Sequence, residues 1–233
     1  MRIRDRDVRR ILAAPFDLRH WRALRRMFSV YEQPVRALAR YLANNGHYPW
    51  QPGLRTPSGV VRPVLTSYHD LLTVNEVFCR QDYGDGAAVD TVVDIGANVG
   101  LAALFFLTRS DRVRVWCCEP DPENIERLTE TLRGRLDRVT IVSKAVTGEP
   151  VSSVRFSAGG RYGRIDGEGT LEVPAISIGE LLRSVTRSVG HIDLVKIDTE
   201  GSELELLNAI PPEVRVGAIV YEDETGRTRW RHD

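Results

Sequence analysis

Acidic side chains at three predicted strand ends are the residues of this sequence that could do chemistry. The first, Asp94, ends the β-branched run at residues 91–95 and opens an Asp-x-Gly-x-Asn-x-Gly turn, with the apolar run 101–107 behind it. The pattern predicts a buried strand, a tight turn and the start of a helix. Gly96 and Gly100 remove side chains where the backbone turns sharply and a ligand comes close. Because open α/β sheets hold ligands at the carboxyl ends of their strands, Asp94 marks a predicted ligand site.

The acid in this turn indicates which ligand it would hold. A dinucleotide loop is Gly-x-Gly-x-x-Gly and holds an anionic pyrophosphate at a helix N-terminus. An acid facing the loop instead favours a ligand with ammonium and sulfonium charge, which points to S-adenosyl-L-methionine. Glu119 ends the second predicted strand, 25 residues after Asp94. An acid at that place is expected to accept hydrogen bonds from the hydroxyls of an adenosine ribose, and Pro120 then turns the chain into the next helix.

The third acid, Asp198, ends the fourth predicted strand in the segment Lys-Ile-Asp-Thr-Glu-Gly-Ser-Glu. In this topology the fourth strand lies beside the first, so Asp198 is expected to face the bound methyl donor. Glu200 and Glu203 open the following helix, where acids are favourable because of the helix dipole. Glu203 is therefore interpreted as a structural residue, whereas Asp198 and Glu200 are the predicted catalytic residues.

Strand-like and helix-like segments alternate from residue 91 onward and predict the elements that position these acids. Such alternation is typical of an α/β fold with a doubly wound, mostly parallel Rossmann-like sheet. The strands are expected at residues 91–95, 113–118, 139–143, 192–197 and 216–221, and the helices at 99–109, 121–134, 178–188 and 201–209. Residues 151–176 add two strand-like segments around a glycine-rich loop, which we interpret as a hairpin or flap between the third and fourth core strands.

An N-terminal helical cap and connector is predicted at residues 1–63, and the ligand-binding domain at residues 64–233. Residues 1–45 carry an apolar stripe at steps of three and four, which predicts helices with a break or kink at Pro34. The stripe consists of Trp21, Leu24, Phe28, Tyr31, Val35, Leu38 and Leu42. Residues 1–40 hold eleven Arg against four acids. The preferred interpretation is a cap packed on the domain, with a dimer surface or a basic platform for weak contact with a membrane-borne acceptor as alternatives.

Composition argues against several other classes of protein. The formal net charge is zero, so the chain as a whole gives no electrostatic reason to bind nucleic acid. Three Cys form no disulfide framework and are expected to be reduced thiols. No stretch approaches the roughly 20 apolar residues of a membrane span, and the charged N-terminus lacks the apolar core of a secretory signal. A cytoplasmic protein is therefore expected.

Two enzyme classes with a similar sheet lack their motifs here. A short-chain dehydrogenase needs a Tyr-x-x-x-Lys pair, but Thr140 and Ile192 stand four residues before Lys144 and Lys196, the only lysines. An adenine-specific nucleic-acid methyltransferase would have Asn/Asp-Pro-Pro-aromatic after the fourth strand, where this chain has Asp-Thr-Glu-Gly.

Four segments together resemble the FkbM family of S-adenosylmethionine-dependent methyltransferases. They are Val-Asp-Ile-Gly-Ala-Asn-Val-Gly, Cys-Glu-Pro-Asp, Leu-Val-Lys-Ile-Asp-Thr-Glu-Gly-Ser-Glu and Val-Tyr-Glu-Asp. The resemblance covers roughly residues 65–223, and its most specific part is Lys-Ile-Asp-x-Glu-Gly. It implies O-methylation of a hydroxyl on a sugar, glycolipid or polyketide-type product. The expected cofactor-binding residues are Asp94, Gly96, Ala97, Asn98, Gly100, Glu119, Pro120, Tyr83, Ala145 and Asp198.

Methyl transfer from a sulfonium is an in-line displacement, so the enzyme must align the acceptor oxygen and should supply a general base. Asp198 is the first candidate, then Glu200, with His69 and His191 behind them. A divalent cation held by Asp198 with Glu222 or Asp223 is the competing device, although no metal is the preferred expectation. A catalytically idle cofactor-binding or scaffolding domain is the alternative from a different class.

The C-terminus departs from the usual methyltransferase sheet, which has an antiparallel strand pair after the fifth strand. Only ten residues follow Asp223, so this pair is predicted to be missing. An uncovered strand edge favours association, and a homodimer is therefore predicted.

Overall fold

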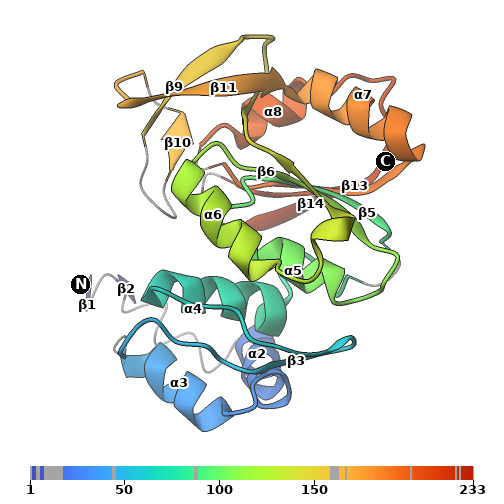
Figure 1. Ribbon diagram of the computed structural model, residues 1–233. Coiled ribbons are helices and arrows are strands. Elements are labelled where there is room, and N and C mark those ends of the chain that lie inside the picture. The colour runs from blue at the N-terminus through green and yellow to red at the C-terminus, as the bar shows by residue number, and fades with distance from the viewer. Residues whose placement is uncertain are drawn as a thin grey trace. The chain divides into compact units, whose positions relative to one another are not determined.

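The chain divides into two compact units, residues 1–82 and 83–233 (Figure 1). A computed structural model describes residues 2–3, 6–7, 18–43, 46–86, 89–157, 163–165, 167–199, 201–223, 225 and 227–232. The chain passes from the first unit to the second after Asp82, whereas the sequence analysis placed a domain boundary after residue 63. Within the first unit, the helical segment at residues 68–80 packs with the N-terminal helices.

The first unit is built mainly from helices. Its elements are β1 (Arg2–Ile3), β2 (Arg6–Asp7), α2 (Leu18–Val30), α3 (Pro34–Ala43), β3 (Leu54–Thr56), β4 (Gly59–Val61), α4 (Tyr68–Val74) and the π-helix η2 (Asn75–Arg80). Pro34 opens α3, where its missing N–H is harmless, so the predicted break in the helical stripe is confirmed. The prediction that residues 1–45 are helical throughout is wrong, because β1 and β2 pair as a short antiparallel ribbon.

The core of this unit lies between α2, α3 and η2. Met27, Tyr31 and Ala37 are buried, and the Tyr31 hydroxyl donates to Asn75 Oδ1 at 3.0 Å. Four members of the predicted apolar stripe are nevertheless exposed, namely Trp21, Phe28, Val35 and Leu42. The stripe is therefore wider than the surface that the core covers.

A six-stranded sheet forms the centre of the second unit, in the order β14-β13-β12-β5-β6-β7. Its strands are β5 (Thr91–Ile95), β6 (Arg114–Cys118), β7 (Val139–Val142), β12 (Ile192–Ile197), β13 (Val216–Glu222) and β14 (Thr228–His232). All neighbours are parallel except β13 and β14. The helices are α5 (Leu101–Leu107), α6 (Pro122–Thr131), the 3-10 turn η3 (Leu136–Arg138), α7 (Ile178–Val189) and α8 (Glu203–Asn208). The predicted doubly wound α/β fold is confirmed.

The sheet's last strand corrects the prediction of an uncovered fifth strand. The chain turns back after Asp223, and β14 pairs antiparallel along β13 from Ala218↔His232 to Glu222↔Thr228. Asp223 Oδ1 accepts from the Thr225 and Arg227 N–H groups, which closes this turn. One antiparallel strand therefore stands where the usual methyltransferase sheet has two, the sheet edge is β14 instead of β13, and the homodimer remains a prediction.

The predicted flap is a second, smaller sheet in the order β10-β9-β11-β8. Its strands are β8 (Ala145–Thr147), β9 (Ser153–Ser157), β10 (Arg164–Ile165) and β11 (Leu171–Ser177). β9 and β11 form the expected antiparallel hairpin, and β11 pairs parallel with β8 immediately before α7 begins.

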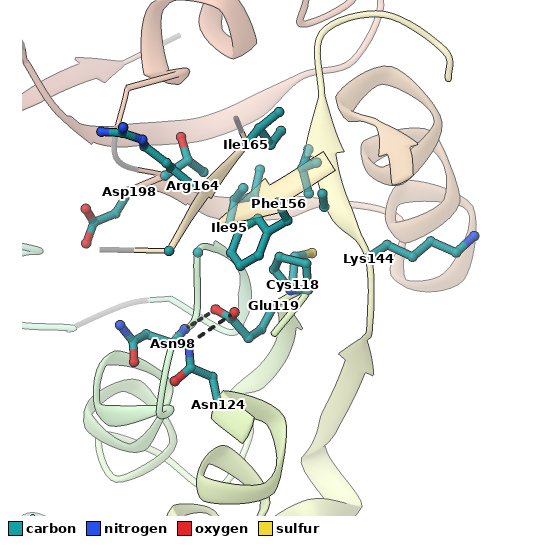
Figure 2. A pocket seen from close by; sticks show the side chains of 16 residues that line it. Ile95, Asn98, Cys118, Glu119, Asn124, Lys144, Phe156, Arg164, Ile165 and Asp198 are labelled. Carbon is teal, nitrogen blue, oxygen red and sulfur yellow. Dashed lines mark hydrogen bonds between the residues drawn. The ribbon is translucent and has the colours of Figure 1, made fainter. Parts of the chain in front are cut away.

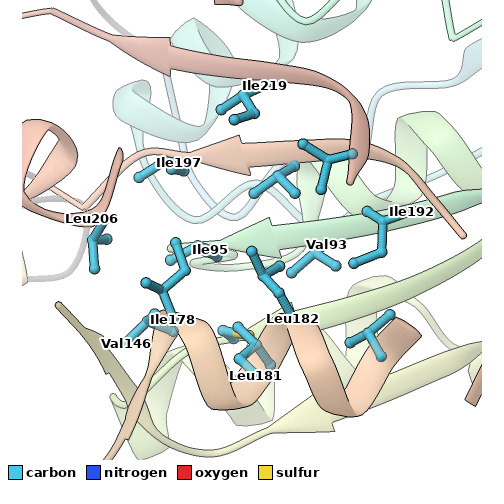
Figure 3. Close-up of a cluster of buried hydrophobic side chains, with 14 of the residues drawn as sticks. Val93, Ile95, Val146, Ile178, Leu181, Leu182, Ile192, Ile197, Leu206 and Ile219 are labelled. Carbon is cyan, nitrogen blue, oxygen red and sulfur yellow. The ribbon is translucent and has the colours of Figure 1, made fainter. Parts of the chain in front are cut away.

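Apolar side chains on both faces of the large sheet hold it in place. Helix α7 lies against one face, where Leu181 and Leu182 approach Val93 and Ile95 of β5 (Figure 3). Helix α5 lies on the other face, and all seven of its residues are buried (Figure 1). A helix whose side chains are apolar on every side has to be buried on every side. Because α5 directly follows the glycine turn, the burial of α5 fixes the end of the turn that joins it.

Gly96 is the residue of this turn that tolerates no side chain. Its φ of +76° is unfavourable for any L residue. A Cβ there would lie 1.9 Å from the Asp198 carbonyl oxygen, because the Asp198 N–H donates to Ile95 O at 3.1 Å and draws the two strand ends together. The glycine turn after β5 and the end of β12 are therefore in backbone contact.

We expect Gly96→Ala to lower the free energy of unfolding by about 3 kcal/mol, from the left-handed φ and from displacement of the β12 end. Gly134→Ala is the matched control, since Gly134 has a φ of +80° but nothing within 4 Å of its Cβ position. It should lose only about 1 kcal/mol. Urea unfolding followed by circular dichroism measures both, and equal losses would contradict the close approach.

Candidate functional site

The glycine turn after β5 is fixed by hydrogen bonds to the end of β6. The N–H groups of Gly96 and Ala97 both donate to the Cys118 carbonyl at 3.0 Å. Asn98 has a φ of +49°, a conformation that Asn adopts more readily than most residues. Its N–H thereby points at Glu119 Oε2, at 2.8 Å. These hydrogen bonds thus hold the turn and Glu119, which follows β6, rigidly together.

The carboxylate of Glu119 is almost completely buried. It is 4% exposed, and Oε1 accepts from the Asp121 N–H at 3.0 Å and from Asn124 Nδ2 at 3.3 Å. Burial raises the pKa of Glu119, while the three donors oppose that rise because they favour the carboxylate. A carboxylate has about four acceptor positions, so one remains for a ligand.

Asp94 is paired with a cation of the protein, and its place in the cofactor site remains a prediction. Its side chain is fully buried, and Oδ1 lies 2.9 Å from Lys196 Nζ on the neighbouring strand β12. Burial raises the pKa of Asp94, and the ammonium opposes this rise. The acid that the sequence assigned to the charge of a ligand is thus already paired with a charge of the protein.

Lys196 connects three oxygens around the strand ends. Besides Asp94, Nζ donates to the Gly96 carbonyl at 3.1 Å and lies 3.5 Å from Asp198 Oδ2. Burial lowers the pKa of Lys196, but the two carboxylates outweigh it and hold the pKa above its usual range. The amine is therefore an ammonium at neutral pH and is no general base.

Asp198 follows β12 and is the more accessible member of this group. Its Oδ2 accepts a hydrogen bond from the Tyr83 hydroxyl at 3.0 Å. The ammonium of Lys196 lies 5.4 Å from the centre of the Tyr83 ring. Tyr83 was predicted to bind the cofactor. The structure places it beside the predicted catalytic acid.

A cleft opens between these strand ends and the small sheet (Figure 2). Six predicted site residues line it: Gly96, Asn98, Glu119, Pro120, Ala145 and Asp198. Sequence reasoning missed Asn124, Lys144, Phe156, Arg164 and Ile165, which also line it. Only Asn124 had a local signal, because it lies one helical turn after the Asp121 N-cap. The others reach the cleft through strand pairing, which has no local signature.

Predicted residues that do not line the cleft have structural places. Ala97 is buried in the turn. Gly100 has a φ of +79°, and a Cβ there would lie 3.1 Å from Leu128 Cγ. Gly100 therefore allows α5 to pack against α6.

The loop after Asp198 is held by Glu203, the first residue of α8. Glu203 Oε1 accepts from the Thr199 N–H at 2.8 Å and from the Gly201 N–H at 3.1 Å. This carboxylate is occupied by its own loop, in agreement with the structural role predicted for it. Glu200, the second predicted catalytic residue, lies outside the described residues.

The remaining candidates for base and metal ligand are elsewhere. His191 precedes β12, at the opposite end of the strand from Asp198, and lies 3.3 Å from Asp193 Oδ1. His69 belongs to the first unit. The Asp223 side chain is taken up by the β13–β14 turn, where hydrogen bonds, first that from Thr225, lower its pKa. The described part of the chain contains no group of three or more His, Cys, Asp or Glu that could hold a metal ion.

Comparisons with known proteins agree with this arrangement. The sequence profile of the Methyltransferase FkbM domain matches residues 94–229, more than half of the chain. No curated protein matches. No described helix is long and apolar enough to cross a membrane.

Several solved structures match the chain at low identity. A precorrin-6y C5,15-methyltransferase from Geobacter metallireducens GS-15 is 15% identical, with 67% of this chain and 63% of that chain covered and a TM-score of 0.36. A methyltransferase from Geobacter sulfurreducens is 17% identical, with 57% and 54% covered and a TM-score of 0.35. The Methanococcus jannaschii fibrillarin pre-rRNA processing protein is 10% identical, with 59% and 47% covered and a TM-score of 0.36.

The chain thus spans about half to two thirds of the length of these structures, and the scores carry no argument about activity. The family profile is the informative match, because it begins at Asp94 and includes Glu119 and Asp198. It supports S-adenosyl-L-methionine as the cofactor. With more than half of its length matched, the chain belongs to the FkbM methyltransferase family.

Proposed function

We propose that the protein is an S-adenosyl-L-methionine-dependent O-methyltransferase that acts on a hydroxyl of a sugar, glycolipid or polyketide-type product. The observation that carries the proposal is that Glu119 and Asp198 line one cleft from the ends of two strands, with the Gly96 turn between them. One acid suits the nucleoside half of the methyl donor, and the other suits the hydroxyl that receives the methyl group.

The cleft fits the cofactor at Glu119. A carboxylate that is nearly buried and holds three donors has a fixed position, and its remaining acceptor position suits one ribose hydroxyl. That acceptor position is on Oε2, which already accepts from Asn98, and a second ribose hydroxyl would need a position that the protein's donors fill. Asn98 and Asn124 line the same wall and supply side-chain amides. The bound cofactor would supply the electrophilic methyl group.

Asp198 is the residue that we assign to the acceptor. Its carboxylate lines the cleft and is held from two sides, by the Tyr83 hydroxyl and the Lys196 ammonium. A hydroxyl placed against it would donate a hydrogen bond, which fixes the direction of the oxygen lone pairs and gives the proton an acceptor as the new C–O bond forms. Lys196 holds the carboxylate and keeps its own proton, because its pKa is raised.

The first prediction concerns cofactor affinity. Glu119→Gln keeps the shape of the side chain but removes the charge, so affinity for S-adenosyl-L-methionine should fall about 10- to 100-fold. Isothermal titration calorimetry with S-adenosyl-L-methionine and S-adenosyl-L-homocysteine measures this. Glu123→Gln, an acid in the first turn of α6, is the control and should keep wild-type affinity. Unchanged affinity in a folded Glu119→Gln variant would remove Glu119 from the cofactor site.

A second prediction separates binding from turnover. Asp198→Asn should lower kcat by about 10²- to 10⁴-fold while cofactor affinity changes little. Transfer of labelled methyl to a panel of glycosides, glycolipids and polyketide alcohols would first identify an acceptor. Asp137→Asn, at an exposed acid in η3, serves as the control. Near-normal turnover in Asp198→Asn would exclude Asp198 as the base. A panel without any product, despite cofactor binding, would favour an idle domain.

The third prediction tests whether a metal takes part. If Asp198 acts as a base without a cation, turnover should be unchanged by excess EDTA, and Asp223→Asn should keep its kcat after correction for the folded fraction. Loss of turnover with EDTA and its recovery with Mg²⁺ would overturn the simple base mechanism in favour of metal-assisted transfer.

A further inference from the structure

Helix α2 exposes part of its apolar sector. Met27 and Tyr31 face the core of the first unit. Phe28 and Trp21 lie on the adjoining strip of the helix and are 49% and 57% exposed. Residues at i and i+7 share a helix face, so Trp21 and Phe28 form one outward strip. Arg25 is exposed between them.

Helix α3 has an outward face of the same kind. Val35 and Leu42, again seven residues apart, are 70% and 66% exposed. Ala39 and Ala43 are exposed on the same side of this helix. The inward side carries buried Ala37 instead. In both helices, the side that points away from the core therefore carries apolar side chains. A surface helix whose outer face meets only water has polar residues there.

The charge beside these faces has one sign. Residues 18–43 contain six Arg, and Glu32 is their one acid. Glu32 is already paired with Arg62, which follows β4. Arg22, Arg25 and Arg36 are exposed. The two helices thus present aromatic and aliphatic side chains together with three exposed guanidinium groups.

We propose that this surface, the outward faces of α2 and α3 with Trp21, Phe28, Val35 and Leu42, docks on an anionic lipid membrane. Exposed aromatic residues with Arg beside them are the features of a segment that lies in the headgroup region, where apolar side chains insert and guanidinium groups meet lipid phosphates. The contact is interfacial and spans nothing, which agrees with the lengths of α2 and α3, 13 and 10 residues.

The charge favours a membrane over the other occupants. A second copy of the chain would bring two arginine-rich faces together, and like charges oppose such a contact. A nucleic acid would use the Arg residues but would leave the aliphatic side chains of α3 without a role. An anionic bilayer satisfies both the charge and the apolar area. Docking would hold the protein next to hydroxyl groups of membrane lipids or of lipid-linked sugars, although the surface contact does not depend on the methyl-transfer proposal.

Vesicle co-sedimentation of the full chain tests the proposal. We expect it to sediment with vesicles of three parts phosphatidylcholine to one part phosphatidylglycerol, and not with pure phosphatidylcholine. Binding should weaken as the salt concentration rises from about 0.1 M to about 0.5 M, because salt screens the charges. The double substitutions Trp21→Ser/Phe28→Ser and Arg22→Glu/Arg25→Glu should each weaken partitioning about tenfold or more.

Two controls match these variants. Val60→Ser removes an exposed apolar side chain of β4 in the same unit. Arg187→Glu/Arg215→Glu makes the same change of net charge at exposed sites in the second unit. Both should partition like the wild type. Circular dichroism on every variant confirms that the fold is retained.

Several outcomes would overturn the proposal. Wild-type protein that does not bind phosphatidylglycerol-containing vesicles would contradict the proposal. Control variants whose partitioning to the vesicles falls as much as that of the α2 variants would show that another surface binds. Dimerisation in analytical ultracentrifugation that Trp21→Ser/Phe28→Ser abolishes would assign the surface to a second copy. Tighter binding to an RNA or DNA oligomer than to the vesicles, lost in Arg22→Glu/Arg25→Glu, would assign it to nucleic acid.

Discussion

The buried ion pair between Lys196 and Asp94 is the interaction on which the rest of the site depends. Both side chains lie inside the sheet, where an uncompensated charge costs several kcal/mol. An ammonium has three N–H donors, and three oxygens surround this one: Asp94 Oδ1 at 2.9 Å, Gly96 O at 3.1 Å and Asp198 Oδ2 at 3.5 Å. One cation therefore joins the end of β5, the glycine turn and the end of β12. Displacing any of the three would leave the ammonium, or an acid, without its partner in a medium of low dielectric constant.

This pairing gives the cleft its geometry before any ligand arrives. The glycine turn is held by Lys196 on one side and by the Cys118 carbonyl on the other, and Gly96 leaves no room between itself and the Asp198 backbone. Glu119 is then fixed through the Asn98 N–H. The two acids proposed for cofactor and acceptor are thus held by one network. A displacement reaction gains most from such fixed positions, since alignment of the reacting atoms is what lowers its barrier.

Sequence periodicity was sufficient for the core strands and helices, because strands buried on both faces are continuous apolar runs that local pattern can detect. It did not reveal the ion pair of Asp94, because the partner Lys196 is distant in the sequence and adjacent only through β5–β12 pairing. The missed strand β14, Thr228–His232, is an exposed edge strand with little apolar alternation. Periodicity also found the apolar stripe of α2 and α3, but it reports that a face is apolar and not whether the protein covers it. Phe156 and Arg164 reach the cleft only through the small sheet, so no spacing in the sequence could predict their place.

The two walls of the cleft differ in how freely they can vary. Glu119 and Asp198 are held in place by the network around Lys196. The opposite wall comes from the small sheet, where Phe156, Arg164 and Ile165 lie beside the cleft (Figure 2). That sheet is an insertion between β7 and β12, outside the alternation that builds the core. The contacts to a methyl donor are the same for every acceptor, so discrimination among acceptors has to come from the wall that the core does not constrain. This wall offers one cationic side chain, Arg164, and the apolar side chains of Phe156 and Ile165.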